Sequence, residues 1–258
     1  MEKRWHALPG AGLQLEVLFY AAASGNEGAP GAPTASRKEP PPPPLVFLHG
    51  AFHGAWCWER FLTFFSAAGY DNYALSLRGH GNSAPGTMQP GSPKGTLASH
   101  AADLAISPHC RGRRALIFGV HRTSPAACRF LFFAADMPAE ELQRYCALLA
   151  AYPPHTLIDR SSAAGAAAPD NLVPQAPPEG GWRQLPPQRV FVGCGKADVL
   201  VDAEAAQETA AYFGTQAALW EGVPHDCMLS RWQEPAASLR HWLDTLSAAP
   251  LVPPRPGE

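Results

Sequence analysis

The stretch over residues 44–58 constrains the fold more than any other part of the sequence. Residues 45–48 form a short apolar run between a proline tract and a glycine turn, which predicts a buried strand. The turn over residues 49–51 follows at once, and an aromatic-rich segment with helical spacing begins near Trp56. Such a strand-to-helix turn places backbone N–H groups above the carboxyl edge of a parallel sheet, where open α/β sheets bind their ligands.

Along the rest of the chain, segments of strand character alternate with segments of helical spacing. Strands are expected over residues 11–22 (as an edge strand), 45–49, 73–77, 114–119, 129–134, 189–193 and 217–220. Helices are expected over residues 58–68, 97–106, 138–151, 203–213 and 229–247. This alternation predicts an α/β fold with a mostly parallel, doubly wound sheet and flanking helices.

The length and the proline distribution set the expected domain organisation. A chain of 258 residues suits one domain, which we place over residues 1–247. The 28 prolines gather partly in segments of little periodicity. These are a Pro/Ala/Gly-rich loop over 23–44, the part after residue 151 of a reduced cap region over 138–187, and a Pro-rich tail over 248–258.

Charge and hydropathy exclude several function classes. The net charge is -2 and no basic run interleaves with aromatic residues, which argues against nucleic-acid binding. No apolar run has the length of a membrane span, and the N-terminus lacks the apolar region of a secretory signal, so a cytoplasmic protein is expected. The six cysteines are scattered without C-x-x-C spacing, which favours reduced thiols over a metal site. No pattern in the sequence indicates an oligomeric state.

Four motifs occur in an order that resembles the α/β-hydrolase superfamily, in particular the esterase branch with plant methylesterases and hydroxynitrile lyases. They are Leu-His-Gly-Ala-Phe-His-Gly-Ala-Trp-Cys-Trp (48–58), Leu-Arg-Gly-His-Gly-Asn-Ser (77–83), Gly-Cys-Gly-Lys-Ala-Asp (193–198) and Glu-Gly-Val-Pro-His-Asp-Cys-Met-Leu (221–229). The resemblance covers about residues 44–135 and 188–247. It implies acyl transfer by a triad, in which a nucleophile attacks a carbonyl, a histidine takes its proton and a carboxylate orients the histidine.

The resemblance assigns three roles. His225 matches the general base, Asp198 matches the acid, and Ala51 matches one oxyanion donor through its backbone N–H. Asp202 is the rival carboxylate, but its position before a helix favours capping. The implied substrate is a small carboxylic ester or a lipid-like acyl compound, and no cofactor is implied because the reaction uses only protein groups and water.

His53 stands four positions after His49, a spacing that could suggest a metal pair. On a turn, a local hydrogen-bonding role is favoured, and we expect no metal site.

The nucleophile position departs from the family. The expected Gly-x-Ser-x-Gly turn reads Gly-Val-His-Arg-Thr-Ser over residues 119–124, with His121 in the serine position. Arg122 stands where the second oxyanion N–H would lie, and Ser124 is the nearest alternative hydroxyl. The predicted pocket lies between Ala51, Phe52, His121, Asp198 and His225. The family implies ester hydrolysis, and the alternative is a catalytically inactive homologue that keeps the pocket for binding or scaffolding.

A second departure concerns chain length. Two adjacent parallel strands need a crossover of about a dozen residues or more. Only residues 120–128 separate the expected strands 114–119 and 129–134, and they include Pro125, which would break a helix interior. Either 129–134 is not the next parallel strand, or the helix that should carry the nucleophile is missing.

Overall fold

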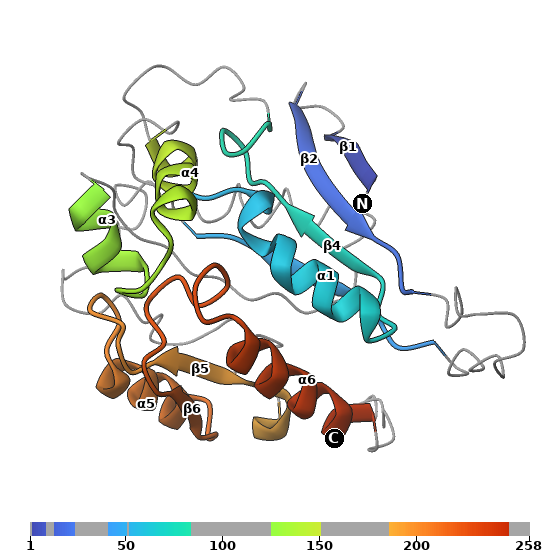
Figure 1. Ribbon diagram of the computed structural model, residues 1–258. Helices are drawn as coiled ribbons and strands as arrows, with labels where there is room; N and C mark the ends of the chain where they lie inside the picture. Colours follow the sequence, from blue (N-terminus) through green and yellow to red (C-terminus); the bar gives the residue numbers. More distant parts are fainter. Residues whose placement is uncertain are drawn as a thin grey trace, which may run out of the picture.

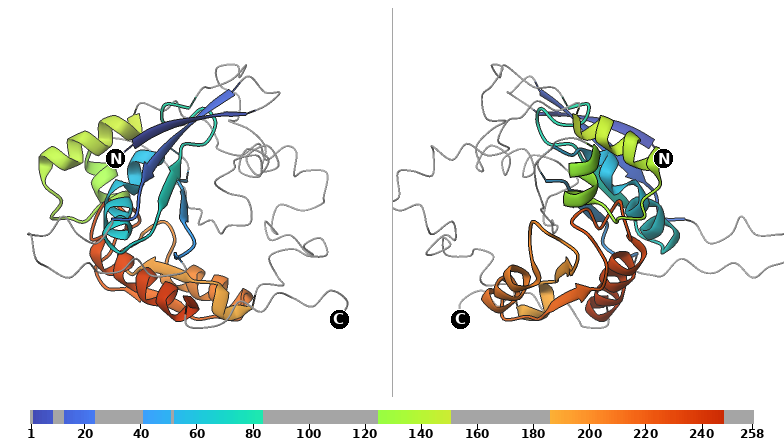
Figure 2. Two further views of the ribbon diagram at one scale, coloured as in Figure 1. Left: turned by 90° about the vertical axis from the view of Figure 1, so that its right-hand side faces the viewer. Right: turned by 60° about the vertical axis from the view of Figure 1, so that its left-hand side comes forward.

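The computed structural model describes residues 2–8, 13–23, 41–50, 52–83, 125–150 and 186–247. Two groups of strands and helices lie side by side, one built from residues 2–83 and one from residues 186–247 (Figure 1). Helices α3 and α4 of the middle segment lie at one end of both groups (Figure 2). The described elements therefore mix strands and helices as an α/β fold requires.

The first group contains a four-stranded sheet in the order β1-β2-β4-β3. Its strands are β1 (Glu2–Leu8), β2 (Leu13–Tyr20), β4 (Asn72–Leu75) and β3 (Leu45–Leu48). The β3–β4 pair is parallel, with Leu45 opposite Asn72, whereas β1–β2 and β2–β4 are antiparallel. The expectation that residues 11–22 form an edge strand is wrong, because β1, which the charged N-terminal sequence did not reveal, pairs with the outer side of β2.

Helix α1 (Glu59–Ala67) follows the short 3₁₀ helix η1 (Ala55–Trp58), as the aromatic spacing predicted. Phe61, Leu62 and Phe65 form its buried face. The helix contacts β2, β4 and the C-terminal helix α6 (Gln233–Ser247), so it lies between the two groups (Figure 1). Gly69 has a φ of +89°, the left-handed conformation in which glycine ends helices.

The strand expected over residues 129–134 is wrong. Helix α3 covers Pro125–Phe132, and a turn leads to α4 (Ala139–Ala150), which confirms the predicted amphipathic helix. Pro125 stands at the start of α3, where a missing N–H costs nothing. Helix α3 begins at Pro125, directly after residues 119–124 in the sequence. The short distance between the expected strands 114–119 and 129–134 therefore does not require that a helix is missing. An unbroken apolar run does not distinguish strand from helix by periodicity.

The second group contains the parallel pair β5 (Val192–Gly195) and β6 (Ala217–Trp220) with helices α5 (Ala203–Tyr212) and α6. The strand predicted over 189–193 begins later, because Pro187–Arg189 form a 3₁₀ turn, η4. Helix α6 begins four residues after the predicted start, since residues 229–232 are turns. The Asp202 side chain accepts a hydrogen bond of 2.8 Å from the Ala205 N–H, which confirms it as the N-cap of α5.

One hydrophobic core joins these elements. It combines Phe47 of β3, the buried face of α1, Phe132 of α3, Tyr145 of α4 and Leu239 of α6. A second, smaller cluster on the sheet contains Val17, Val46, Leu48, Leu75 and Leu77. Burial of these side chains from distant parts of the chain fixes the strand ends that carry the site.

Several predictions fall outside the described residues. They are the helix over 97–106, the strand over 114–119, the tail over 248–258, and most of the 23–44 loop and of the cap region after α4. Within the described ranges, no helix is both long enough and apolar enough to cross a membrane.

Candidate active site

Asp198 and His225 meet at the carboxyl ends of neighbouring parallel strands. The Nδ1–H of His225 donates a hydrogen bond to Asp198 Oδ2 at 2.7 Å, and the two side chains are 4% and 7% exposed. Asp198 Oδ1 accepts the backbone N–H groups of Leu200 (2.8 Å) and Val201 (2.9 Å). The carboxylate is thus held by three donors, and the ring is oriented so that Nε2 is the nitrogen able to accept a proton.

Close contact between two strand ends brings this pair together. A Cβ on Gly195, the last residue of β5, would lie 1.9 Å from the Val223 carbonyl oxygen. That oxygen accepts the Ala197 N–H at 3.1 Å, and the Trp220 carbonyl accepts the Lys196 N–H at 2.8 Å. Because these bonds tie the turn after β5 to the turn after β6, Asp198 and His225 approach from segments that are 27 residues apart.

The turn after β3 is held by its first histidine. His49 Nδ1–H donates to the Gly50 carbonyl at 2.6 Å, while Nε2 accepts the Leu77 N–H at 2.9 Å. The bond from Leu77 ties the turn after β3 to the end of β4. Phe52 is buried with a φ of +65°, a conformation that costs a non-glycine residue about 1–3 kcal/mol.

The predicted oxyanion and nucleophile residues lie outside the described residues. They are Ala51, His121, Arg122 and Ser124. Their roles therefore stay predictions.

His53 makes a contact that the sequence interpretation missed. Its Nε2 lies 3.0 Å from Asp226 Oδ2, and the side chains are 2% and 1% exposed. The expectation of a merely local role for His53 is wrong, because the partner comes from the far end of the sequence. Asp226 directly follows His225, so this pair connects the turn after β3 with the loop that carries the predicted base.

A family model described as "Alpha/beta hydrolase family" matches residues 45–121, which include the turn after β3. A probable esterase of Oryza sativa subsp. indica is 30% identical over 104 residues, 37% of this chain and 40% of that protein. A pFDCC methylesterase of Arabidopsis thaliana is 50% identical over 37 residues, 14% of each chain. The chain thus matches less than half the length of these curated relatives.

The fold agrees with this sequence match. The crystal structure of a bromoperoxidase from Bacillus anthracis superposes with a TM-score of 0.57, covering 94% of this chain and 100% of that one at 13% identity. Residues 45–121 are thus similar to the α/β-hydrolase family, and the described part of the chain has the α/β-hydrolase fold. The two curated relatives named above are esterases. At 13% sequence identity, the similarity to the bromoperoxidase shows the fold alone.

A buried carboxylate holds the second loop motif, residues 77–83, in place. Glu16 of β2 forms an ion pair with Lys3 (2.8 Å) and accepts hydrogen bonds from the Ser76 hydroxyl (2.8 Å) and from the backbone and side-chain N–H groups of Asn82. Ser76 Oγ in turn accepts the Ala55 N–H at 2.8 Å. Burial by itself raises the pKa of Glu16, but the hydrogen bonds from Lys3, Asn82 and Ser76 together outweigh it and lower the pKa.

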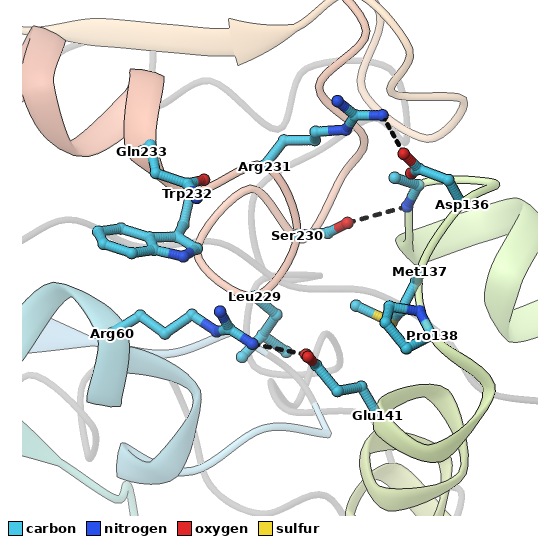
Figure 3. A pocket seen from close by; sticks show the side chains of 11 residues that line it. Arg60, Asp136, Met137, Pro138, Glu141, Leu229, Ser230, Arg231, Trp232 and Gln233 are labelled. Atoms are coloured by element: carbon cyan, nitrogen blue, oxygen red, sulfur yellow. Dashed lines mark hydrogen bonds and ion pairs between the residues drawn. The ribbon is translucent and has the colours of Figure 1, made fainter.

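Two cavities lie near the His225 loop. One has a volume of about 490 Å³ and is lined by two ion pairs of 2.5 Å, Arg60–Glu141 and Arg231–Asp136 (Figure 3). Each arginine of this cavity is therefore paired with a carboxylate. The other, of about 620 Å³, is lined by Ala197, Val199 and Pro224, the chain neighbours of Asp198 and His225, and by two aromatic rings of the α3 region, Phe130 and Phe133. The second cavity therefore offers apolar surface beside the pair.

Cysteines near the pair are poor nucleophiles. Burial, with the nearby Asp226 and Asp198 carboxylates, raises the pKa of Cys227 to about 12. Burial, with Asp198, raises the pKa of Cys194 to about 11. Because the thiolate is the reactive form, neither thiol supplies one at neutral pH. Among the described residues, no group of three or more His, Cys, Asp or Glu side chains could hold a metal ion.

Proposed function

We propose that this α/β-hydrolase hydrolyses small carboxylic esters, with His225 as the general base and Asp198 as the residue that orients it. The 2.7 Å hydrogen bond between His225 Nδ1–H and the buried Asp198 carboxylate carries the proposal. A fixed imidazole–carboxylate pair at the end of parallel strands is the arrangement that removes a proton from an attacking oxygen.

The attacking oxygen is assigned to water or to Ser124, because His121 stands where the family has its serine. In the water route, the water oxygen attacks the ester carbonyl while its proton passes to His225 Nε2. Asp198 stabilises the imidazolium, and the same proton then passes to the leaving alkoxide. The ester and one water molecule become a carboxylic acid and an alcohol.

The size of the substrate follows from the cavity of about 620 Å³ beside the pair. Small-molecule sites have volumes of roughly 300–1,000 Å³ and mostly apolar linings with few polar groups. Phe130, Phe133, Val199 and Pro224 provide the apolar part of such a lining, and Arg129, Asp136 and Arg231 provide its charged part. We therefore assign a small ester with an apolar acyl or alcohol group as the substrate class.

The second candidate function is binding without turnover. His121 favours it, since the sequence contains no Gly-x-Ser-x-Gly turn anywhere. Removing the serine of a triad leaves only the contribution of binding and of the oxyanion donors. A silent homologue would keep the strand-end pair and the cavity as a scaffold for a small acyl compound.

Turnover of p-nitrophenyl acetate separates the two candidates. The wild type is compared with His225→Ala and with His241→Ala, a matched control whose histidine is exposed on α6. Hydrolysis requires turnover in the wild type and the control and background rates in His225→Ala. Equal background rates in all three proteins would establish the silent homologue.

A fluorophosphonate probe then identifies the attacking group. Stoichiometric labelling that is lost in Ser124→Ala assigns the nucleophile to Ser124. Turnover without labelling assigns it to water.

A further inference from the structure

Two acid–imidazole pairs occur on consecutive residues of one loop. His225 pairs with Asp198 at 2.7 Å, and Asp226 pairs with His53 at 3.0 Å. The side chain of His53 is 2% exposed and that of Asp226 is 1% exposed. The second pair is thus even less exposed than the first.

Hydrogen bonds fix the main chain of Asp226 through both its N–H and its carbonyl. Its N–H donates to the Phe132 carbonyl at the end of α3 at 2.9 Å. Its carbonyl accepts the N–H groups of Leu229 (3.0 Å) and Ser230 (2.9 Å), which shape the turns leading to α6. The position of Asp226 therefore determines where the adjacent His225 lies.

The ring of His53 is fixed by aromatic stacking. It stacks on Trp56 with ring centroids 5.4 Å apart, Trp56 stacks on Tyr145 at 6.1 Å, and Tyr145 stacks on Phe133 at 5.7 Å. These rings come from η1, α4 and the turn after α3. His53 itself lies between the predicted oxyanion residue Ala51 and Gly54 in the turn after β3.

We propose that His53 and Asp226 are positioning residues that set the distance between the turn after β3 and the His225 ring. The proposal rests on the proposed function, because it concerns how the same site is held together. An oxyanion donor and a general base must both be placed within hydrogen-bond reach of one reacting carbonyl. The His53–Asp226 contact is a direct side-chain link between the two segments that supply them.

Three variants test the contact. His53→Leu removes the donor and leaves a buried carboxylate unpaired, and Asp226→Asn removes the charge. His53→Gln is the conservative variant, because its amide nitrogen can donate from nearly the position of the imidazole Nε2. Ser238→Ala is the matched control, since it removes a hydrogen bond of 3.0 Å from Trp220 to α6 that lies outside the His225 loop.

The first readout is the proton NMR signal of His225 Nδ1–H, which a short hydrogen bond to a carboxylate moves far downfield and which is assigned by its loss in His225→Ala. Thermal unfolding of each variant is measured alongside. We expect the signal to shift or disappear in His53→Leu and Asp226→Asn, to return in His53→Gln and to stay unchanged in Ser238→Ala.

The second readout is ester turnover. Misplacement of a catalytic group by about 1 Å can cost about 100-fold in rate, so kcat in His53→Leu should fall by this order while KM changes little. An unchanged His225 signal in folded His53→Leu would overturn the proposal. If that variant does not fold, the signal in Asp226→Asn decides. If the wild type has no turnover, the proposed function fails, whereas the NMR result still decides the role of the pair.

Discussion

Gly195 lies directly against the backbone carbonyl of Val223, with no room for a side chain between them. The contact joins the end of β5, three residues before Asp198, to the segment two residues before His225. The spacing of Asp198 and His225 thus depends on the smallest residue at one strand end.

Replacement of Gly195 by alanine should therefore be costly. The new Cβ would lie 1.9 Å from the Val223 oxygen and 2.5 Å from its carbonyl carbon, so backbone must move. We expect a loss of about 3 kcal/mol in the free energy of unfolding measured with urea, at the upper end of overpacking effects. Gly222→Ala is the control, because Gly222 has a φ of +66° but open space around it, and it should cost about 1–2 kcal/mol. Equal losses in the two variants would contradict the steric explanation.

The two carboxylates near the end of β5 have different tasks. Asp198→Asn should lower kcat for p-nitrophenyl acetate by about 10⁴-fold, because an amide no longer holds the imidazole in the tautomer needed for proton transfer. Asp202→Asn or Asp202→Ala should leave kcat unchanged, and the alanine variant should lose about 1 kcal/mol of stability with its N-cap hydrogen bond. Steady-state kinetics and urea unfolding test both statements. A comparable loss of kcat in the Asp202 variants would reverse the assignment.

The buried Glu16 carboxylate predicts sensitivity to acid. Its pKa is lowered in the folded protein, so the unfolded chain binds the proton more readily. The stabilisation is present above the ordinary carboxyl pKa of 4.5 and is lost as the pH falls through the lower folded value. Glu16→Gln should lose about 2 kcal/mol at neutral pH, and the difference from the wild type should shrink in acid. Glu2→Gln, at an exposed ion pair with Arg4, serves as the control and should change stability little. A pH-independent difference would exclude the charge as its origin.

Three thiols with raised pKa values should resist alkylation. Burial raises the pKa of Cys57 well above its ordinary value, and the pKa values of Cys227 and Cys194 are about 12 and 11. With iodoacetamide at pH 8, peptide mapping by mass spectrometry should find these three residues unmodified in the native protein and fully modified in urea. Rapid native labelling of Cys227 would show that the loop beside His225 opens readily.

Local sequence patterns predicted much of the fold. Strand β3, helix α4, strand β6 and the cap residue Asp202 appear where apolar spacing and capping chemistry placed them. Local patterns failed at β1, whose charged residues resemble a loop until a neighbouring strand pairs with them. They failed again at α3, where the apolar run becomes helical with Cys128 and Phe132, four residues apart, buried in the core.

The sequence by itself indicated the candidate pair through its resemblance to α/β-hydrolases. Asp198 and His225 each follow a short apolar strand, and parallel strands place such positions along one edge of a sheet. Only the tertiary structure decided that Asp226 reaches His53 across 173 positions and that Glu16 lies beneath the turn that contains Asn82. Both contacts give a buried carboxylate a polar partner from a segment that no local pattern relates to it. Their partners were selected by how the strands and helices pack, because a buried charge must find its partner wherever the fold brings one within reach.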